Sequence, residues 1–592
     1  MLLWVFIFQE GNQAVEEEEV VTGKAEFQIT GYERPLYFYM PPMGPLVSSF
    51  PGWNEIFNLK FEDSLKFVNS FNVPQKPKKK GWSSGRPGKS ELDEYYNKMA
   101  QYGVGLIRVG LFKEGVNALS EVVEYSGFPP EVSYVVRTYY ILGLLYSGDD
   151  EGARSYGSIF LSDYYNRPWN IGMGWVIWEA GEANLYGKHF LQAESIYAKN
   201  INEGQDGLVK SLSRVGAAWA NLYAQKFSDA LSHAKQSQEF LNGVPLAHAQ
   251  IAEGIATFNL GDIEGAKNIF DNIQITGHPP TDVLIYYYRG FNYEALRMYD
   301  LALQNYQKVM QDYANLPTAG EAAYRTYTIY LGQNKINEAK KTLEWFVERF
   351  PQHPEAPRAL YTLSEIYFSQ KDYKTALSYL RKIYINYPNS ELYSIARQRA
   401  QQVYNVIARE DTVELWNFLR EFPNSDDAAD ALIYWGGKLL DEKRELLAAR
   451  FYYKMGSEFP KHRQAPEALF TAGQIYFKNK MWDDAVQTFG KIVDLYPNYE
   501  EVNKAKLFLA ISLIYDGKPV QAISILKKEL GRGDLTDAER ADLLKYLGIA
   551  YKEIGKSYEA RDALEEARVL YFGLGKLDEV DNVDKLLQDI PY

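Results

Sequence analysis

The sequence contains no cysteine and only six histidines among its 592 residues. Without cysteine the chain forms no disulfide, no zinc–thiolate or iron–sulfur site, no cysteine nucleophile and no lipid anchor on cysteine. The histidines make no H-E-x-x-H motif, and His353 and His462 each follow a proline by two residues. We interpret both as exposed turn residues, and we expect neither a metal site nor a cofactor.

An excess of positive charge and a long apolar run are also missing. The chain has 64 Lys and Arg against 77 Asp and Glu, a net charge of -13, which argues against nucleic acid or an anionic membrane as partner. The apolar run Met1 to Phe8 is far too short to span a bilayer, which takes about 20 residues. We interpret this run as a clipped or atypical export signal; the alternative is an apolar strand or tail.

Glycine-rich nucleotide motifs are incomplete. Gly88-Lys89-Ser90 resembles the end of a phosphate-binding loop, but Ser83 stands where the first glycine is needed. The acidic residues are numerous, yet nothing in the pattern sets one carboxylate apart as a general acid. We therefore expect that the protein is not an enzyme.

The first ninety residues differ from the rest of the chain. They hold ten acidic and ten basic side chains, so the whole net charge falls on residues 91–592. Residues 25–30 alternate polar and apolar side chains and residues 35–40 form a short aromatic run, a pattern that predicts two short strands within an N-terminal segment, residues 1–73. Residues 74–90 are rich in Pro, Gly, Ser and Lys, which is typical of a flexible basic linker.

A period of about 37 residues organises residues 91–592. Prolines stand at positions 351, 388, 423, 460 and 497, spaced 35 to 37 residues apart. Each closes a segment in which a large residue, a Leu-Gly-like pair, a Tyr, a small Ala and a second large residue follow at fixed spacing. The small-residue positions extend outward from Gly115 to Ala560, with a degenerate unit near Asp411.

These residues resemble the tetratricopeptide repeat (TPR), whose pattern is W-x₂-L-G-x₂-Y…A-x₃-F…P. The resemblance implies an all-α protein, a right-handed superhelical solenoid of about 13 helix pairs, following the small β-containing N-terminal segment. In this family, protein or peptide segments bind in the concave groove that the first helix of each pair lines. The expected function is therefore a protein–protein interaction scaffold or adaptor. Its partner and oligomeric state are left open.

The junctions between repeats add a finer resemblance. Phe350-Pro351, Tyr387-Pro388-Asn389-Ser390 and Tyr496-Pro497-Asn498 are similar to junctions of periplasmic TPR proteins of Gram-negative bacteria, the outer-membrane-assembly and Tol–Pal-coordinator types. This resemblance implies a periplasmic or exported protein acting in cell-envelope assembly or maintenance; otherwise the chain is cytoplasmic. Two alternatives are a structural part of a periplasmic machine, such as a flagellar motor or pilus, and a cell-wall enzyme with a helical superstructure.

The alignment also predicts which first-helix side chains face the groove. An aromatic row there suits an apolar or proline-rich partner, although the same residues could instead pack between repeats. The predicted groove residues are Tyr287, Phe291, Tyr324, Tyr361, Glu365, Phe368, Phe470, Gln474 and Phe477.

Overall fold

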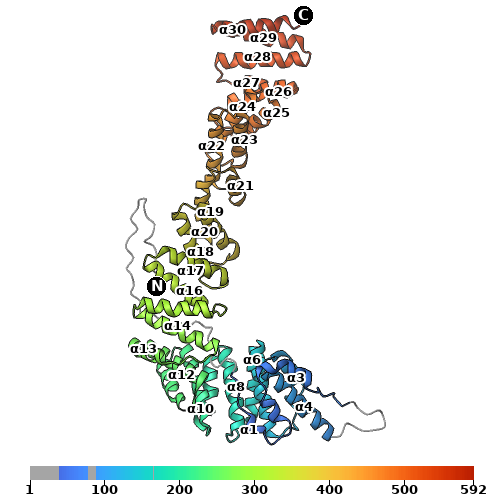
Figure 1. Ribbon diagram of the computed structural model, residues 1–592. Helices are drawn as coiled ribbons and strands as arrows, with labels where there is room; N and C mark the ends of the chain where they lie inside the picture. Colours follow the sequence, from blue (N-terminus) through green and yellow to red (C-terminus); the bar gives the residue numbers. More distant parts are fainter. Residues whose placement is uncertain (1–38, 78–88, 165, 592) are drawn as a thin grey trace, which may run out of the picture. The chain divides into compact units, whose positions relative to one another are not determined.

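The computed structural model describes residues 39–77, 89–164 and 166–591 (Figure 1). The chain divides into two compact units, unit 1 up to Ala356 and unit 2 from Pro357 onward. Every regular element in the described ranges is helical. None of these helices has the length and hydropathy needed to cross a bilayer.

In the described part of unit 1, four short helices come first and are followed by long helices in pairs. Its elements are α1 (Gly44–Val47), α2 (Trp53–Phe57), η1 (Phe61–Asp63), α3 (Ser64–Ser70), α4 (Lys89–Arg108), α5 (Phe112–Ser120), α6 (Pro130–Ser147), α7 (Asp150–Tyr164), α8 (Ile171–Tyr186), α9 (Phe190–Glu203), α10 (Gly207–Tyr223), α11 (Phe227–Ser237), η2 (Gln238–Phe240), α12 (Gly243–Asn259), α13 (Ile263–Asn272), α14 (Pro279–Ala295), α15 (Tyr299–Asp312), α16 (Thr318–Gly332) and α17 (Ile336–Arg349).

Unit 2 continues the pairs and ends on a single helix. Its elements are α18 (Ala356–Ser369), α19 (Tyr373–Asn386), α20 (Leu392–Ile407), α21 (Thr412–Glu421), α22 (Asp426–Asp441), α23 (Glu445–Glu458), α24 (Ala465–Lys478), α25 (Trp482–Leu495), α26 (Val502–Tyr515), α27 (Pro519–Leu530), α28 (Asp537–Glu553), α29 (Ser557–Gly573) and α30 (Leu577–Gln588).

The helices from α4 to α29 form thirteen consecutive hairpins, which confirms the expected helical repeat array. In each hairpin the fourth residue of the second helix is the small-residue position of the sequence pattern. Ala153, Ala376 and Ala485 at this position are fully buried, because a small side chain lets the two helices approach closely. In the degenerate unit the equivalent residue is Leu415, also fully buried, on the short helix α21.

The turn inside each hairpin has a second recurring feature. The residue two positions before the second helix is left-handed in twelve of the thirteen hairpins, for example Lys371 (φ 61°), Lys480 (φ 58°) and Gly517 (φ 75°). The Lys371 and Asp372 amides donate to carbonyls of the preceding helix, which completes a Schellman cap. Only some of these positions are glycine, so glycine spacing alone does not reveal the feature.

The first helices of successive hairpins form a layer of their own. In unit 1, α6 packs on α8, α8 on α10 and α10 on α12, and in unit 2 α26 packs on α28. One hairpin cannot bury its apolar face alone, so each unit is stabilised by contacts between neighbouring hairpins. We call the exposed side of this layer of first helices the inner face.

The N-terminal segment corrects one expectation. Residues 44–70 form α1, α2, η1 and α3, and no strand occurs in the described residues; the predicted strand at 25–30 lies outside them, and residues 39 and 40 of the second one are irregular. The apolar residues there recur at helical spacing, and they find a surface on α4 and α6 that buries them. The run Met1 to Phe8 and linker residues 78–88 also lie outside the described ranges.

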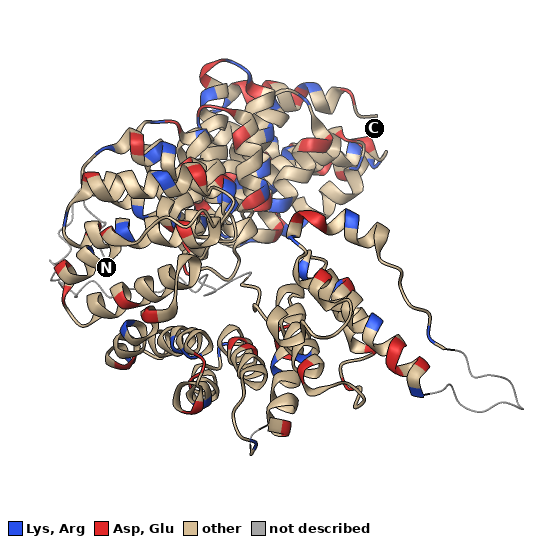
Figure 2. Ribbon diagram, turned by 60° about the horizontal axis from the view of Figure 1, so that its bottom comes forward, with Lys and Arg blue, Asp and Glu red and all other residues tan. Residues whose placement is uncertain are grey.

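Acidic and basic side chains are interspersed along the helices. Figure 2 shows both signs on the ribbon of most long helices. Many form pairs within one helix or between successive hairpins, such as Lys199–Glu203 and Lys478–Glu445. Exposed pairs of this kind contribute little stability each, about 0–1 kcal/mol. The array is therefore held together chiefly by its apolar contacts.

Candidate binding surface

Residues 39–71, here called the docked segment, lie against the inner face of the first three hairpins in unit 1. Helix α1 contacts α6, while α2 and α3 contact α4. The side chains of Met43, Val47, Trp53 and Ile56 are at most 3% exposed. The inner face at α4, α6 and α8 is thus covered by a polypeptide segment of the same chain.

Three side chains of the inner face donate hydrogen bonds to main-chain carbonyls of the docked segment. Gln101 Nε2 donates to the Pro51 carbonyl at 2.7 Å, and Arg108 Nη2 donates to the Phe57 carbonyl at 2.9 Å. The Tyr139 hydroxyl donates to the Pro41 carbonyl at 3.0 Å. These three contacts recognise main-chain atoms of the segment and not its side chains.

Arg108 joins the first two hairpins to the segment. Its Nη1 donates to the Tyr139 hydroxyl at 2.8 Å, and its guanidinium lies 4.9 Å from the centre of the Phe57 ring. The Phe57 ring in turn meets Tyr139 edge-on at 5.9 Å. Burial raises the pKa of Tyr139 to about 12, so the hydroxyl stays protonated and free to donate.

The inner face of α4 is shaped to receive aromatic rings. A Cβ at Gly105 would lie 2.2 Å from Cζ of Phe67, a distance at which something must shift. The absence of a side chain at position 105 therefore leaves the space that the Phe67 ring fills. Phe67 also stacks with Tyr102 of α4 at 6.1 Å.

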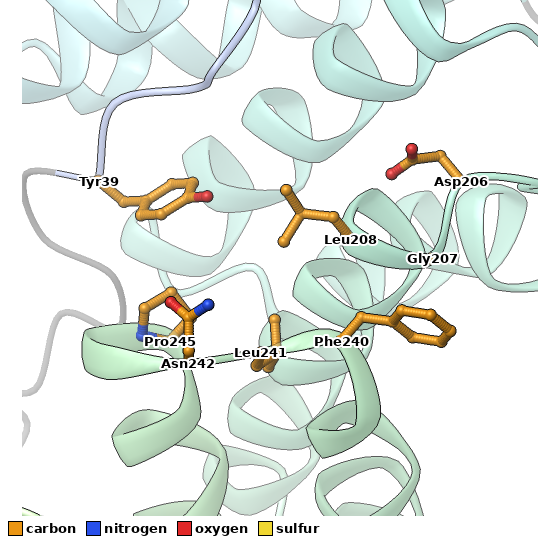
Figure 3. Close-up of a pocket in the computed structure, with 8 residues that line it drawn as sticks. All are labelled: Tyr39, Asp206, Gly207, Leu208, Phe240, Leu241, Asn242 and Pro245. Atoms are coloured by element: carbon orange, nitrogen blue, oxygen red, sulfur yellow. The ribbon is translucent and has the colours of Figure 1, made fainter.

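The first residue of the docked segment, Tyr39, contacts α8 and lies beside a cleft. The Tyr39 ring meets Trp178 edge-on at 5.7 Å, and on the same face of α8 lie Trp175 and the buried acids Glu179 and Glu182. A cleft of about 370 Å³ opens next to Tyr39. In Figure 3 it lies between Tyr39 and the N-terminal ends of α10 and α12, with Asp206, Gly207, Leu208, Phe240, Leu241, Asn242 and Pro245 around it.

In unit 1 the predicted groove residues are part of the packing. Tyr287 is 1% and Phe291 4% exposed, and both contact Arg325 of the next first helix. Arg325 Nε donates to the Tyr287 hydroxyl at 3.0 Å, and its guanidinium lies 4.1 Å from the Phe291 ring centre. Tyr324 is half-buried and stacks on His353. Tyr287 and Phe291 therefore hold successive hairpins together and are not available to a partner.

In unit 2 the predicted residues fall into three situations. Glu365 and Phe368 come together through Arg399, which donates to both Glu365 oxygens at 2.8 and 2.9 Å and covers the Phe368 ring at 4.0 Å. Phe470 is 7% exposed and meets Phe508, as Phe477 does, so the aromatic pair packs between α24 and α26. Tyr361 is half-buried and Gln474 exposed; a binding role for these two stays a prediction.

The two turn histidines are not exposed, which corrects a second expectation. His353 is 7% exposed and its Nε2 lies 2.9 Å from Glu321 Oε1; His462 Nε2 lies 3.3 Å from Asp430. In both pairs the acid precedes the histidine by 32 residues. A proline turn at the end of one repeat is thus fastened to the first helix of the same repeat. No group of metal-binding side chains occurs in the described ranges.

The residues that contact the docked segment were not found from the sequence. Gln101, Arg108 and Tyr139 lie where the repeat pattern is weakest. A usable signal did exist at α8, where Glu179 and Glu182 interrupt an otherwise apolar stretch. With Trp175 and Trp178 they recur at positions three and four apart, which places all four on one helical face.

Comparison with known proteins supports the repeat assignment. Residues 328–391 and 467–499 each match a tetratricopeptide repeat family model, so the chain carries TPR repeats. A stretch of 104 residues is 32% identical to ER membrane protein complex subunit 2-A of Xenopus laevis, covering 18% of this chain and 33% of that protein. A similar match occurs in the Xenopus tropicalis subunit. The chain thus spans about a third of the length of these curated relatives.

Two solved structures align over much of the chain at low identity. The TPR domain of P58(IPK) covers 83% of this chain and 98% of its own, with 12% identity and a TM-score of 0.26. The human IFIT1 dimer with m7Gppp-AAAA covers 89% of this chain and 94% of its own, with 13% identity and a TM-score of 0.31.

Proposed function

We propose that this TPR-containing chain is a non-enzymatic scaffold that binds polypeptide segments on the inner face of its helical hairpins. The observation that carries the proposal is the docked segment. The inner face of α4, α6 and α8 buries its apolar side chains, while Gln101, Arg108 and Tyr139 bind its main-chain carbonyls. Such a surface has the chemistry to recognise an extended or short helical segment of a protein.

The proposal is tested by panning a random peptide library on the full-length chain. Hydrogen exchange of the tightest complex should then show new protection on the first helices of the hairpins. Protection confined to the second helices, or no binder at all, would contradict the proposal.

We also propose that the protein works in the envelope of a bacterial cell, in assembly or maintenance. The support is the similarity of the repeat junctions around Pro351, Pro388 and Pro497 to those of periplasmic TPR proteins. Fractionation of the source cells followed by mass spectrometry of the protein's N-terminus tests this. Protein in the cytoplasmic fraction that retains Met1 would refute an envelope location.

A further inference from the structure

Helix α8 buries two carboxyl groups without a basic partner. Glu179 and Glu182 are each 2% exposed, and Glu179 Oε1 and Glu182 Oε2 have no hydrogen-bond partner. The other Glu182 oxygen accepts from the Tyr197 hydroxyl at 2.6 Å. In the described part of the chain neither acid forms an ion pair. Buried acids are normally paired, because leaving one unpaired costs free energy.

Two tryptophans lie beside these acids on the same face of α8. Trp175 and Trp178 meet edge-on at 5.8 Å, and the Trp178 indole N–H has no acceptor. An aromatic face and a carboxylate are the two groups that proteins use to bind a Lys or Arg side chain. Here both are present within one helical turn, but the cation is absent from the described residues around them.

The present occupant covers the Trp178 side of this site without supplying a positive charge. Tyr39 covers Trp178, and the chain is fixed two residues later through the Pro41 carbonyl. The phenol of Tyr39 carries no positive charge, and burial raises its pKa further. The cleft beside Tyr39 (Figure 3), with Asp206 and Asn242 on its walls, leaves open space next to the residue that a partner would replace.

We propose that the inner face of α8 is a receptor for a basic side chain, Arg or Lys, carried by a polypeptide partner that replaces residues 39–41. The base would lie against Trp178, where the Tyr39 ring now lies, and pair with Glu179 and Glu182. The inference rests on the proposed function, and it names the charge that the partner must carry. The docked segment then fits the groove in shape but carries no positive charge at position 39.

The test uses the full chain and places the base within the segment itself. Tyr39→Arg and Tyr39→Gln are each made in the native background and together with Glu179→Gln plus Glu182→Gln. Amide exchange of residues 43–70 measures how firmly the segment is docked. We expect Arg at position 39 to slow this exchange about tenfold relative to Gln, because one charge-assisted hydrogen bond stabilises the docked state by about that factor. This difference should appear only when both carboxyls are present.

Glu124→Gln, at an exposed glutamate of unit 1, is the matched control and should leave the Arg advantage intact. Equal exchange for Arg and Gln in the native background would overturn the inference. So would an Arg advantage that survives removal of both carboxyls.

A second measurement keeps the inference testable if the double Gln background unfolds. Labelled peptides of residues 39–57, with Arg or Gln in place of Tyr39, are titrated against the wild-type chain by fluorescence anisotropy. We expect the Arg peptide to bind about tenfold more tightly. Binding of both peptides with equal affinity would overturn the charge requirement while leaving the proposed scaffold function standing, and binding of neither would overturn the inference.

Discussion

Arg108 and Tyr139, whose guanidinium and hydroxyl lie 2.8 Å apart, act together on the same bound segment. Arg108 binds the Phe57 carbonyl at the end of α2, and Tyr139 binds the Pro41 carbonyl just before α1. The first two hairpins therefore clamp the stretch that contains α1 and α2 at its two ends. Since each donor also positions the other, the two contacts should be energetically coupled.

Replacing Arg108 by Met should loosen the docked segment while the hairpins stay folded. The change removes hydrogen bonds from a charged donor, which are worth about 1.5–3 kcal/mol each. Amide exchange of residues 44–70 should therefore accelerate strongly, whereas exchange within α10 to α16 should not change. Arg154→Met, at an arginine of α7 that pairs with Glu151, is the control. If both variants accelerate exchange alike, the clamp is not what holds the segment.

Gly105 and Gly490 offer a matched pair of glycine-to-alanine changes in helices. Alanine at 105 collides with the Phe67 ring, so docking should weaken by about 1–3 kcal/mol. Alanine at 490 meets nothing within 4 Å, so α25 should gain up to about 1 kcal/mol from its better helix propensity. Amide exchange of α3 and of α25 in the two variants measures both effects; a gain at position 105 would contradict the described packing.

The stability of α8 should fall as the pH rises. Burial raises the pKa of Glu182 to about 8, and burial together with Glu182 raises the pKa of Glu179 well above its ordinary value near 4.5. The folded state thus holds protons that the unfolded state releases, so the contribution of these acids is complete below pH 4.5 and is lost as pH rises toward 8.

Comparison with Glu179→Gln plus Glu182→Gln isolates this effect. The titratable groups that interact with the two acids include Tyr186 of α8, which hydrogen-bonds Glu182, together with Tyr197 of α9 and Tyr139 of α6, whose raised pKa values keep them protonated in this range. The opening free energy of α8 in the wild type should decline relative to the variant by up to about 1.4 kcal/mol per pH unit for each acid. Parallel pH profiles for the two proteins would show that the acids are not buried without a partner.

Lys480 and Gly517 occupy the same left-handed turn position in adjacent hairpins. Lys480→Gly removes the cost of a side chain at positive φ and should stabilise its hairpin by about 0.5–1 kcal/mol. Gly517→Lys should destabilise the next hairpin by a similar amount. Thermal unfolding of the two variants, with the exposed Lys461→Gly as a control outside this position, measures the pair. Equal shifts at 480 and 461 would contradict the role of the turn.

The spacing of the small residues was sufficient to predict the repeat array. Ala153, Ala376 and Ala485 all take the position that the pattern assigned, because close helix crossing admits only a small side chain. The left-handed turns were not predicted, because Lys, Gln, Arg or Asn stands in place of Gly in seven of them. A Schellman cap depends on main-chain geometry, which several residue types reach at a modest cost.

The candidate site was much harder to predict. Offsets within the repeat correctly placed Tyr287 and Phe291 on the first helix, but they could not show that Arg325, 34 residues beyond Phe291, covers both. Nor does periodicity reveal that residues 39–71, which carry no repeat, bind to the repeats. Contacts between a repeat and a non-repeating segment have no fixed spacing, so only the folded chain displays them.

The hydrogen bonds that Gln101, Arg108 and Tyr139 donate to the docked segment end on carbonyl oxygens, a group that every amino acid possesses. Among descendants of this sequence, the identity of the exposed residue 51 is therefore free to drift as long as the backbone keeps its path, whereas Pro41 is buried and the Phe57 ring contacts Arg108 and Tyr139. The donors Gln101, Arg108 and Tyr139 have no such freedom. Selection should accordingly act more strongly on the three donors than on residue 51, whose carbonyl is bound while its side chain is exposed.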